Sequence, residues 1–151
     1  MRNAILPAAM LCLCLALMTG CKPAWTGKPE TVLTIAQIEE AFAAQGIPLQ
    51  PETSGEARTA SVLSMPLNGV APVLFVIHDG QRIAVYLYAS AKGVTRAEED
   101  FAEKTAAADV IAHGRYAAAN ALVAYDYASS RSAMGEDIRV AQAVQALAKR
   151  L

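Results

Sequence analysis

The sequence predicts an α+β domain in which a mainly antiparallel sheet of about four to five strands packs against three helices. The Asp79-Gly80 pair separates two apolar runs, which is typical of a β-hairpin. Thr-x-x-Gln and Thr-x-x-Glu patterns at residues 34–37 and 95–98 precede apolar residues at helical spacing. The expected order is helix, strand, hairpin, helix, strand or strand pair, helix. Hairpins mixed with helices indicate an antiparallel sheet with helices packed on it.

The first helix is expected to begin near Thr34. Thr34 and Gln37 have the spacing of a capping box, and Leu33 and Ile38 stand where a hydrophobic staple would form. Gly46 is well placed to end the helix, because a left-handed residue commonly follows a helix C-terminus.

The clearest β-strand signal lies in the middle of the chain. Residues 60–65 are expected to form a strand, followed by a turn at residues 66–69. Residues 73–78 and 82–89 then predict the two strands of a hairpin around Asp79-Gly80. This pair favours a type I′ turn, in which both central residues need a positive φ.

The second half of the chain predicts the remaining elements. The pattern at residues 95–98 indicates a helix over residues 96–107. Residues 110–117 are ambiguous and are interpreted as a short strand, whereas residues 120–127 form a clearer one. A closing helix from about residue 136 has one apolar stripe, made of Ile138, Ala141, Val144, Leu147 and Leu151.

The N-terminus has the character of an export signal. Arg2 is followed by an uncharged apolar stretch over residues 4–18, which matches the n-region and h-region of a signal peptide. A membrane-spanning helix needs roughly 20 apolar residues, so this stretch is short for a permanent anchor. Pro7 also interrupts it.

The end of this stretch, Leu17-Met18-Thr19-Gly20-Cys21, resembles the lipobox of bacterial lipoproteins. The resemblance implies a diacylglycerol on the Cys21 sulfur and cleavage just before Cys21. Alternatives are an ordinary signal peptide that is cut elsewhere, or a retained signal anchor.

The lipobox resemblance predicts three parts of the chain. Residues 1–20 would be a lipoprotein signal peptide, residues 21–32 the lipidated cysteine and its tether, and residues 33–151 a single α+β domain. The protein would then be held by lipid on the extracytoplasmic face of a cell membrane.

Composition excludes several classes of chemistry. Cys12 and Cys14 would leave with the signal peptide and Cys21 would carry lipid, so the mature domain would have no disulfide or cysteine metal ligand. Only two histidines, His78 and His113, remain for a zinc site that needs three or four ligands. We therefore expect no metal and no cofactor. Without Arg2 the chain has 12 basic and 14 acidic residues, a net charge of −2 that gives no reason to expect nucleic acid.

Motifs of enzymes are missing as well. The sequence contains no G-x-S-x-G, S-x-x-K, P-loop or G-x-G-x-x-G pattern. The acidic run at residues 98–100 is interpreted as favouring the dipole in the first turns of a helix, rather than as a calcium site.

Four tyrosines form the candidate ligand or partner surface: Tyr86, Tyr88, Tyr125 and Tyr127. They alternate along two predicted strands of which neither face is cleanly polar, whereas a sheet with one wet face should alternate more sharply. Either helices cover both faces of the sheet, or a tyrosine-lined face meets a partner. Ordinary packing of the rings at the edge of the core is the simpler alternative.

The domain also shows a loose resemblance to small uncharacterised lipoproteins of Gram-positive bacteria. It rests on LNGVAP at residues 67–72, IAVYLYAS at residues 83–90 and NALVAYDY at residues 120–127. This resemblance implies no particular activity.

The function expected from the sequence is that of a membrane-anchored binding or accessory module without catalysis. Its partners would be the membrane, through the lipid, and an envelope protein or a small ligand. The alternative is an envelope enzyme whose site is assembled only in the fold, with His78 or His113 beside a carboxylate.

Overall fold

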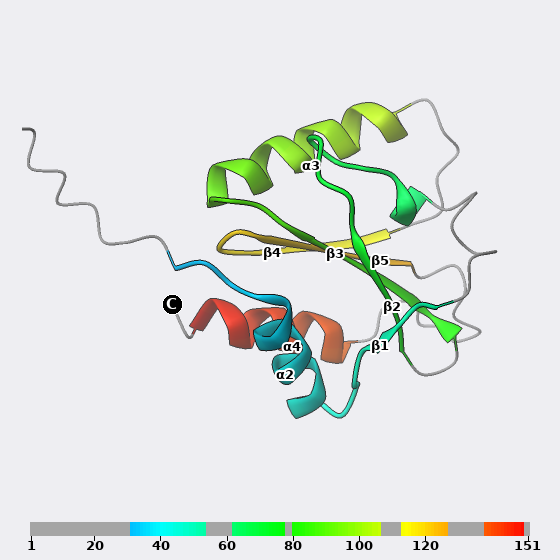
Figure 1. Ribbon diagram of the computed structural model, residues 1–151, viewed down its shortest axis with the longest axis vertical. Coiled ribbons are helices and arrows are strands. Elements are labelled where there is room, and N and C mark those ends of the chain that lie inside the picture. Colours follow the sequence, from blue (N-terminus) through cyan, green and yellow to red (C-terminus); the bar gives the residue numbers. More distant parts are fainter. Residues whose placement is uncertain (1–30, 54–61, 78–79, 107–112, 127–137, 150–151) are drawn as a thin grey trace, which may run out of the picture.

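The structure is a computed structural model that describes residues 31–53, 62–77, 80–106, 113–126 and 138–149. The described residues form three α-helices and a five-stranded antiparallel sheet of order β1-β2-β3-β5-β4, which confirms the predicted α+β class (Figure 1). The elements are α2 (Ile35–Ala44), β1 (Gln50–Pro51), the 3₁₀ helix η3 (Val62–Ser64), β2 (Val73–Val76), β3 (Arg82–Leu87), α3 (Ala91–Thr105), β4 (His113–Ala118), β5 (Ala121–Asp126) and α4 (Ile138–Lys149). The predicted signal peptide and most of the predicted tether lie outside the described residues.

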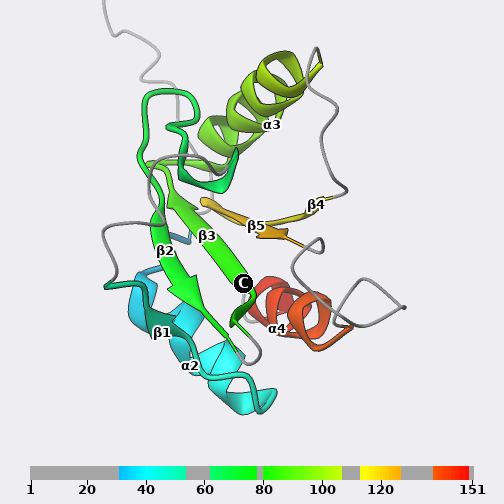
Figure 2. The ribbon, with the colours of Figure 1, turned by 90° about the vertical axis from the view of Figure 1, so that its right-hand side faces the viewer.

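Helices cover both faces of the sheet. Figure 2 shows α2 and α4 on one side of the strands and α3 on the other. Along β3, Ile83 and Val85 enter the larger core under α2 and α4, whereas Ala84 and Tyr86 enter the smaller core under α3 and η3. A central strand that is buried on both faces has no reason to alternate between apolar and polar residues, which explains the pattern in the sequence.

Helix α2 begins and ends as predicted. The Gln37 amide donates to Thr34 Oγ1 at 3.4 Å, and the Thr34 amide donates to Gln37 Oε1 at 2.9 Å, which completes the capping box. Leu33 and Ile38 are both buried in the larger core, in the positions of the predicted staple. Gly46 follows the helix with a φ of +74°, a conformation that is easy for glycine.

The predicted hairpin is confirmed, but its turn differs from the prediction. Strands β2 and β3 pair in antiparallel fashion, and the Ile77 amide donates to the Gln81 carbonyl at 2.9 Å. Three residues, 78–80, therefore connect the paired strands, instead of the two that a type I′ turn would have. Gly80 has a φ of +76°, as expected for the last residue of a three-residue hairpin loop.

The strand predicted at residues 60–65 is wrong where the structure describes it, because Val62–Ser64 forms the 3₁₀ helix η3. Leu63 is fully buried in the smaller core. The single proton of the Tyr86 hydroxyl is shared between the carbonyls of Leu63 and Met65, whose oxygens lie 3.1 and 2.9 Å from the hydroxyl oxygen. The apolar residues of this segment thus cover one face of the sheet instead of adding a strand to it.

Helix α3 begins at Ala91, five residues earlier than predicted. Thr95 does not cap the helix, since its hydroxyl lies inside it and donates to the Ala91 carbonyl at 3.5 Å. Gly93 permits the early start, because a Cβ there would lie 2.7 Å from the Tyr88 Cβ. The first turn of α3 can therefore lie directly against the end of β3, a contact that helical periodicity does not reveal.

The acidic run also differs from its interpretation, since residues 98–100 lie in the middle of α3 and its first turn contains no acidic residue. Asp100 instead holds the turn at residues 66–69. Its Oδ2 accepts from the Asn68 amide at 2.6 Å and from Lys104 Nζ at 2.8 Å, and Lys104 also donates to the Pro66 carbonyl at 2.8 Å. These hydrogen bonds lower the pKa of the Asp100 carboxyl, and the one from Lys104 has the largest effect.

The last three elements follow the prediction closely. Strands β4 and β5 pair with each other, and α4 closes the chain. The apolar stripe of α4 is rotated from the predicted one, because Ile138 is 68% exposed. The buried positions of α4 are Val140, Ala143, Val144 and Leu147.

The β4–β5 turn contains a buried polar contact that fixes the start of the domain. Asn120 Oδ1 accepts from the Leu33 amide at 2.6 Å, and Asn120 Nδ2 donates to the Leu33 carbonyl at 3.3 Å and to the Tyr88 carbonyl at 2.8 Å. The Asn120 side chain thus binds both backbone groups of Leu33, as a neighbouring strand would. We call this contact the Asn120 clip.

Candidate functional site

The predicted tyrosine surface is not formed by the three of its four tyrosines that the structure describes. Tyr86 and Tyr88 are buried in the smaller core and Tyr125 is buried in the larger one, on the opposite face of the sheet. This corrects the expectation of a partner surface and agrees with the alternative of ordinary packing. Tyr127 lies outside the described residues.

The hydroxyls of the buried tyrosines have hydrogen-bond acceptors inside the fold. Tyr88 donates to the Leu67 carbonyl at 3.2 Å, and Tyr125 donates to the Gln81 side chain. Burial raises the pKa of the Tyr86 hydroxyl, with a smaller contribution from Tyr88. Burial, followed by the charge of Asp100, raises the pKa of Tyr88 to about 12.

These tyrosines predict a loss of stability in alkali. The pKa of an unfolded tyrosine is 10.0 and that of the folded Tyr88 is about 12. As the pH rises, the unfolded state therefore loses its proton first. The contribution of Tyr88 is complete below pH 10 and is lost progressively up to about pH 12, with a loss of about 1 kcal/mol at pH 11. Urea unfolding at pH 9 and pH 11 measures this change. Tyr88→Phe should show a smaller drop, and an equal drop in both proteins would contradict the assignment.

The alternative of a site with His78 or His113 beside a carboxylate is not tested by the described residues. His78 lies outside the described residues, and His113 opens β4 with a side chain that is not described. Among the described residues, no three His, Cys, Asp or Glu side chains gather where they could hold a metal ion. None of the described helices has the length and apolar character needed to cross a membrane.

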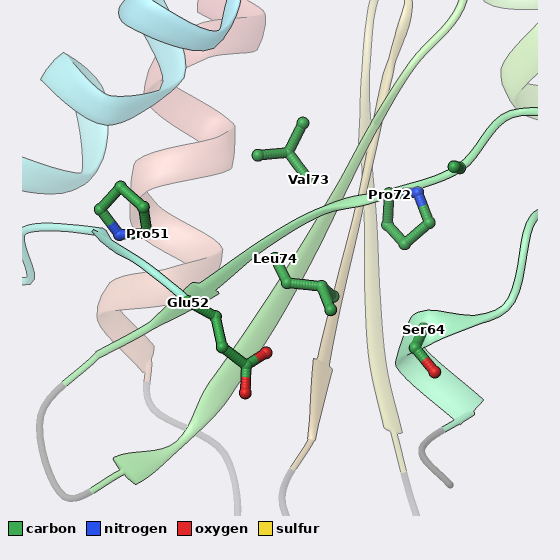
Figure 3. A pocket seen from close by; sticks show the side chains of 7 residues that line it. Pro51, Glu52, Ser64, Pro72, Val73 and Leu74 are labelled. Atoms are coloured by element: carbon green, nitrogen blue, oxygen red, sulfur yellow. The ribbon is translucent and has the colours of Figure 1, made fainter. Parts of the chain in front are cut away.

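A hollow of about 430 Å³ lies beside the outer strands β1 and β2 (Figure 3). Its lining consists of Pro51, Glu52, Ser64, Ala71, Pro72, Val73 and Leu74. The hollow follows from the uneven cover of this face of the sheet. Among the described residues, the main strand contacts of α3 are with β5, and those of η3 are with β3 and β5, so these two elements pack less closely on β1 and β2.

Glu52 is the unusual residue of this hollow. Its amide donates to the Leu74 carbonyl at 3.0 Å, which continues the pairing of β1 with β2. Its side chain is only 5% exposed, and its Oε1 lies 3.3 Å from Nε of Arg82. Its Oε2 is buried and has no hydrogen-bond partner among the described residues.

A buried polar atom without a partner is uncommon in native proteins and calls for an explanation. For a carboxylate oxygen the cost is high, since burial removes water that would otherwise solvate the charge. The pair with Arg82 offsets only part of this cost, because it occupies one of the two oxygens. Such a local departure from good folding rules is typical of functional sites.

Comparisons with protein-family models, with curated proteins and with solved structures returned no match.

The lining of the hollow combines one carboxylate and one hydroxyl with apolar residues. Figure 3 shows the Glu52 side chain extending from the end of β1 past Leu74, with Pro72 and Ser64 across the same space. Glu52 is the one ionisable side chain among the seven lining residues. Together with its apolar neighbours, this carboxylate offers a charged contact and an apolar surface to a ligand.

Sequence reasoning missed this site. Glu52 belongs to a polar segment after Pro51 that is typical of an exposed turn. Its burial follows from the register of β1 on β2, in which Pro51 pairs with Phe75. Phe75 lies 24 positions after Pro51 in the sequence, and no local pattern in one sequence reports such a pairing.

Proposed function

We propose that this protein is a lipid-anchored extracytoplasmic lipoprotein whose α+β domain is a non-catalytic binding module. The observation that carries the binding role is the hollow beside β1 and β2, with its single buried carboxylate and its apolar walls. Small-molecule sites are typically mostly apolar clefts of about 300–1,000 Å³ with a few placed polar groups. A volume of about 430 Å³ lies within this range.

The cellular address is supported by the lipobox-like motif that ends at Cys21. The first buried residue that the structure describes is Leu33, which the Asn120 clip holds. Residues 22–32 thus lie between the proposed lipid and the fixed start of the domain. This spacing suits a tether that separates a folded module from the membrane surface.

The address predicts that Cys21→Ala abolishes lipid labelling. Cells that produce the protein are fed an alkyne-tagged palmitate, and the label on the protein is measured together with its share in the membrane fraction. We expect the wild type to be labelled and sedimented with membranes, because each buried CH₂ contributes about 0.8 kcal/mol to anchoring. Cys21→Ala should lose the label.

Cys12→Ala and Cys14→Ala are the matched controls, since both cysteines lie in the predicted signal peptide. Both variants should keep the label and the membrane association of the wild type. Unchanged labelling of Cys21→Ala would refute the lipoprotein proposal.

A further inference from the structure

We propose that the hollow beside β1 and β2 binds an organic ammonium group carried on a short apolar chain, with an N–H of the ammonium donating to Glu52 Oε2. This inference rests on the proposed binding role of the hollow and is independent of the lipid anchor. It follows from the charge of the lining, the number of free acceptor oxygens and the apolar character of the walls.

The charge of the lining favours a cation. Glu52 supplies a negative charge inside the hollow, where its side chain is 5% exposed. Arg82, its ion-pair partner, does not line the hollow, and its side chain is 31% exposed. Solvent therefore screens the positive charge of Arg82 more than the negative charge of Glu52. The hollow thus presents a net negative charge to a bound ligand. Charge-assisted hydrogen bonds are about twice as strong as neutral ones, so an N⁺–H donor gains more here than a hydroxyl.

The geometry of the carboxylate favours ammonium over guanidinium. A guanidinium binds a carboxylate best as a fork, with two parallel N–H donors on the two oxygens. In this site Arg82 Nε already lies 3.3 Å from Oε1, which leaves Oε2 as the acceptor. An ammonium is a compact donor that needs a single oxygen, so it can pair with Oε2 once a small turn of the Glu52 side chain opens this buried oxygen to the hollow.

The walls of the hollow favour a ligand with an apolar body. Apart from Glu52 and Ser64, the lining is made of alanine, proline, valine and leucine side chains. Leu74, whose side chain lies on the same side of β2 as that of Glu52, is only partly buried (Figure 3). A chain of several methylenes would cover this surface, at about 0.8 kcal/mol for each buried CH₂. The volume of about 430 Å³ leaves room for such a chain beside the ammonium group.

The test compares two probes of equal length, n-butylammonium chloride and 1-butanol. The full-length, ¹⁵N-labelled protein in detergent is titrated with each probe, and shifts of the Glu52, Ser64 and Leu74 amide signals are followed by NMR. We expect saturable shifts with both probes and about tenfold tighter binding of n-butylammonium. Added NaCl should weaken the binding of the ammonium and leave that of the alcohol unchanged.

Glu52→Gln keeps the shape of the side chain and removes its charge, so it should bring the two probes to within about twofold of each other. Glu99→Gln is the matched control, since Glu99 is an exposed carboxylate on α3, and it should keep the tenfold preference. Equal affinities for the two probes in the wild type would overturn the ammonium proposal while leaving the hollow as a binding site. Absence of shifts with either probe would overturn both. The wild-type comparison stands alone if Glu52→Gln does not fold, and neither result bears on the labelling of Cys21.

Discussion

Asn120→Ala is expected to lower the free energy of unfolding by about 3 kcal/mol, because several buried polar groups lose their hydrogen-bond partners and their costs add up. The Asn120 clip satisfies the Leu33 amide, the Leu33 carbonyl and the Tyr88 carbonyl, and its side chain is 1% exposed. Alanine can replace none of these hydrogen bonds. Each buried group left without a partner costs about 1–3 kcal/mol, although entering water can recover part of this loss. Urea unfolding followed by circular dichroism measures the change.

Two further variants separate the clip from a general effect of substitution. Asn120→Asp keeps an acceptor for the Leu33 amide but places a buried carboxylate oxygen against the Leu33 and Tyr88 carbonyls, so it should be at least as destabilising as Asn120→Ala. Gln145→Ala, at an exposed position of α4, should change stability by no more than about 0.5 kcal/mol. If Asn120→Ala were as mild as Gln145→Ala, the clip would not be a main support of the domain start.

Tyr86→Ala is expected to be at least as damaging, with a loss of about 4 kcal/mol, as for other large aromatic residues truncated in a core. The Tyr86 ring is among the largest fully buried side chains and lies in the smaller core. Its hydroxyl also holds η3 through the carbonyls of Leu63 and Met65. Truncation therefore opens a cavity and at the same time releases the segment that covers it.

Tyr86→Phe divides these two contributions. It keeps the ring and removes the hydroxyl proton that the two carbonyls share, so we expect a loss of about 1–2 kcal/mol. Thermal and urea unfolding of the two variants give the share of the ring as the difference between them. If both variants lost the same stability, the packing of the ring would contribute little, and the smaller core would depend on the hydroxyl alone.

The elements that local sequence predicted well are those with local causes. The capping box of Thr34 and Gln37 and the stop at Gly46 act within a few residues of the helix that they delimit. The β2–β3 hairpin likewise joins neighbours along the chain. Each of these signals depends on backbone geometry within one turn, so a single sequence contains it in full.

The errors have distant causes. Helix α3 starts early because Gly93 lies against Tyr88, and residues 62–64 form a 3₁₀ helix over the smaller core instead of a strand. Thr95 has the right residue type for a cap, and nothing nearby in the sequence shows that Ser90 precedes the helix instead. These outcomes depend on which surfaces meet in the fold, and tertiary packing overrides local preference.

The candidate site belongs to the same group of distant effects. Glu52 could be placed in a hollow only by knowing that β1 pairs with β2 and that, among the described elements, α3 and η3 pack mainly on β3 and β5. The tyrosines were predicted to form a surface because they alternate along the strands. Alternation, however, indicates only the face of the sheet on which a ring lies. Whether that face is covered depends on helices elsewhere in the chain.

If Cys21 carries the proposed lipid, the Asn120 clip would also set how far from the bilayer the domain can work. Because the clip holds Leu33, the proposed tether cannot lengthen by drawing out residues of the domain. Eleven residues, 22–32, then separate Cys21 from the clip, and a fully extended chain spans at most about 3.3–3.6 Å for each residue. The start of the domain would stay within about 40 Å of its lipid. A ligand of the Glu52 hollow would thus have to come to the membrane surface, and the working range of the module would be set by tether length and not by affinity.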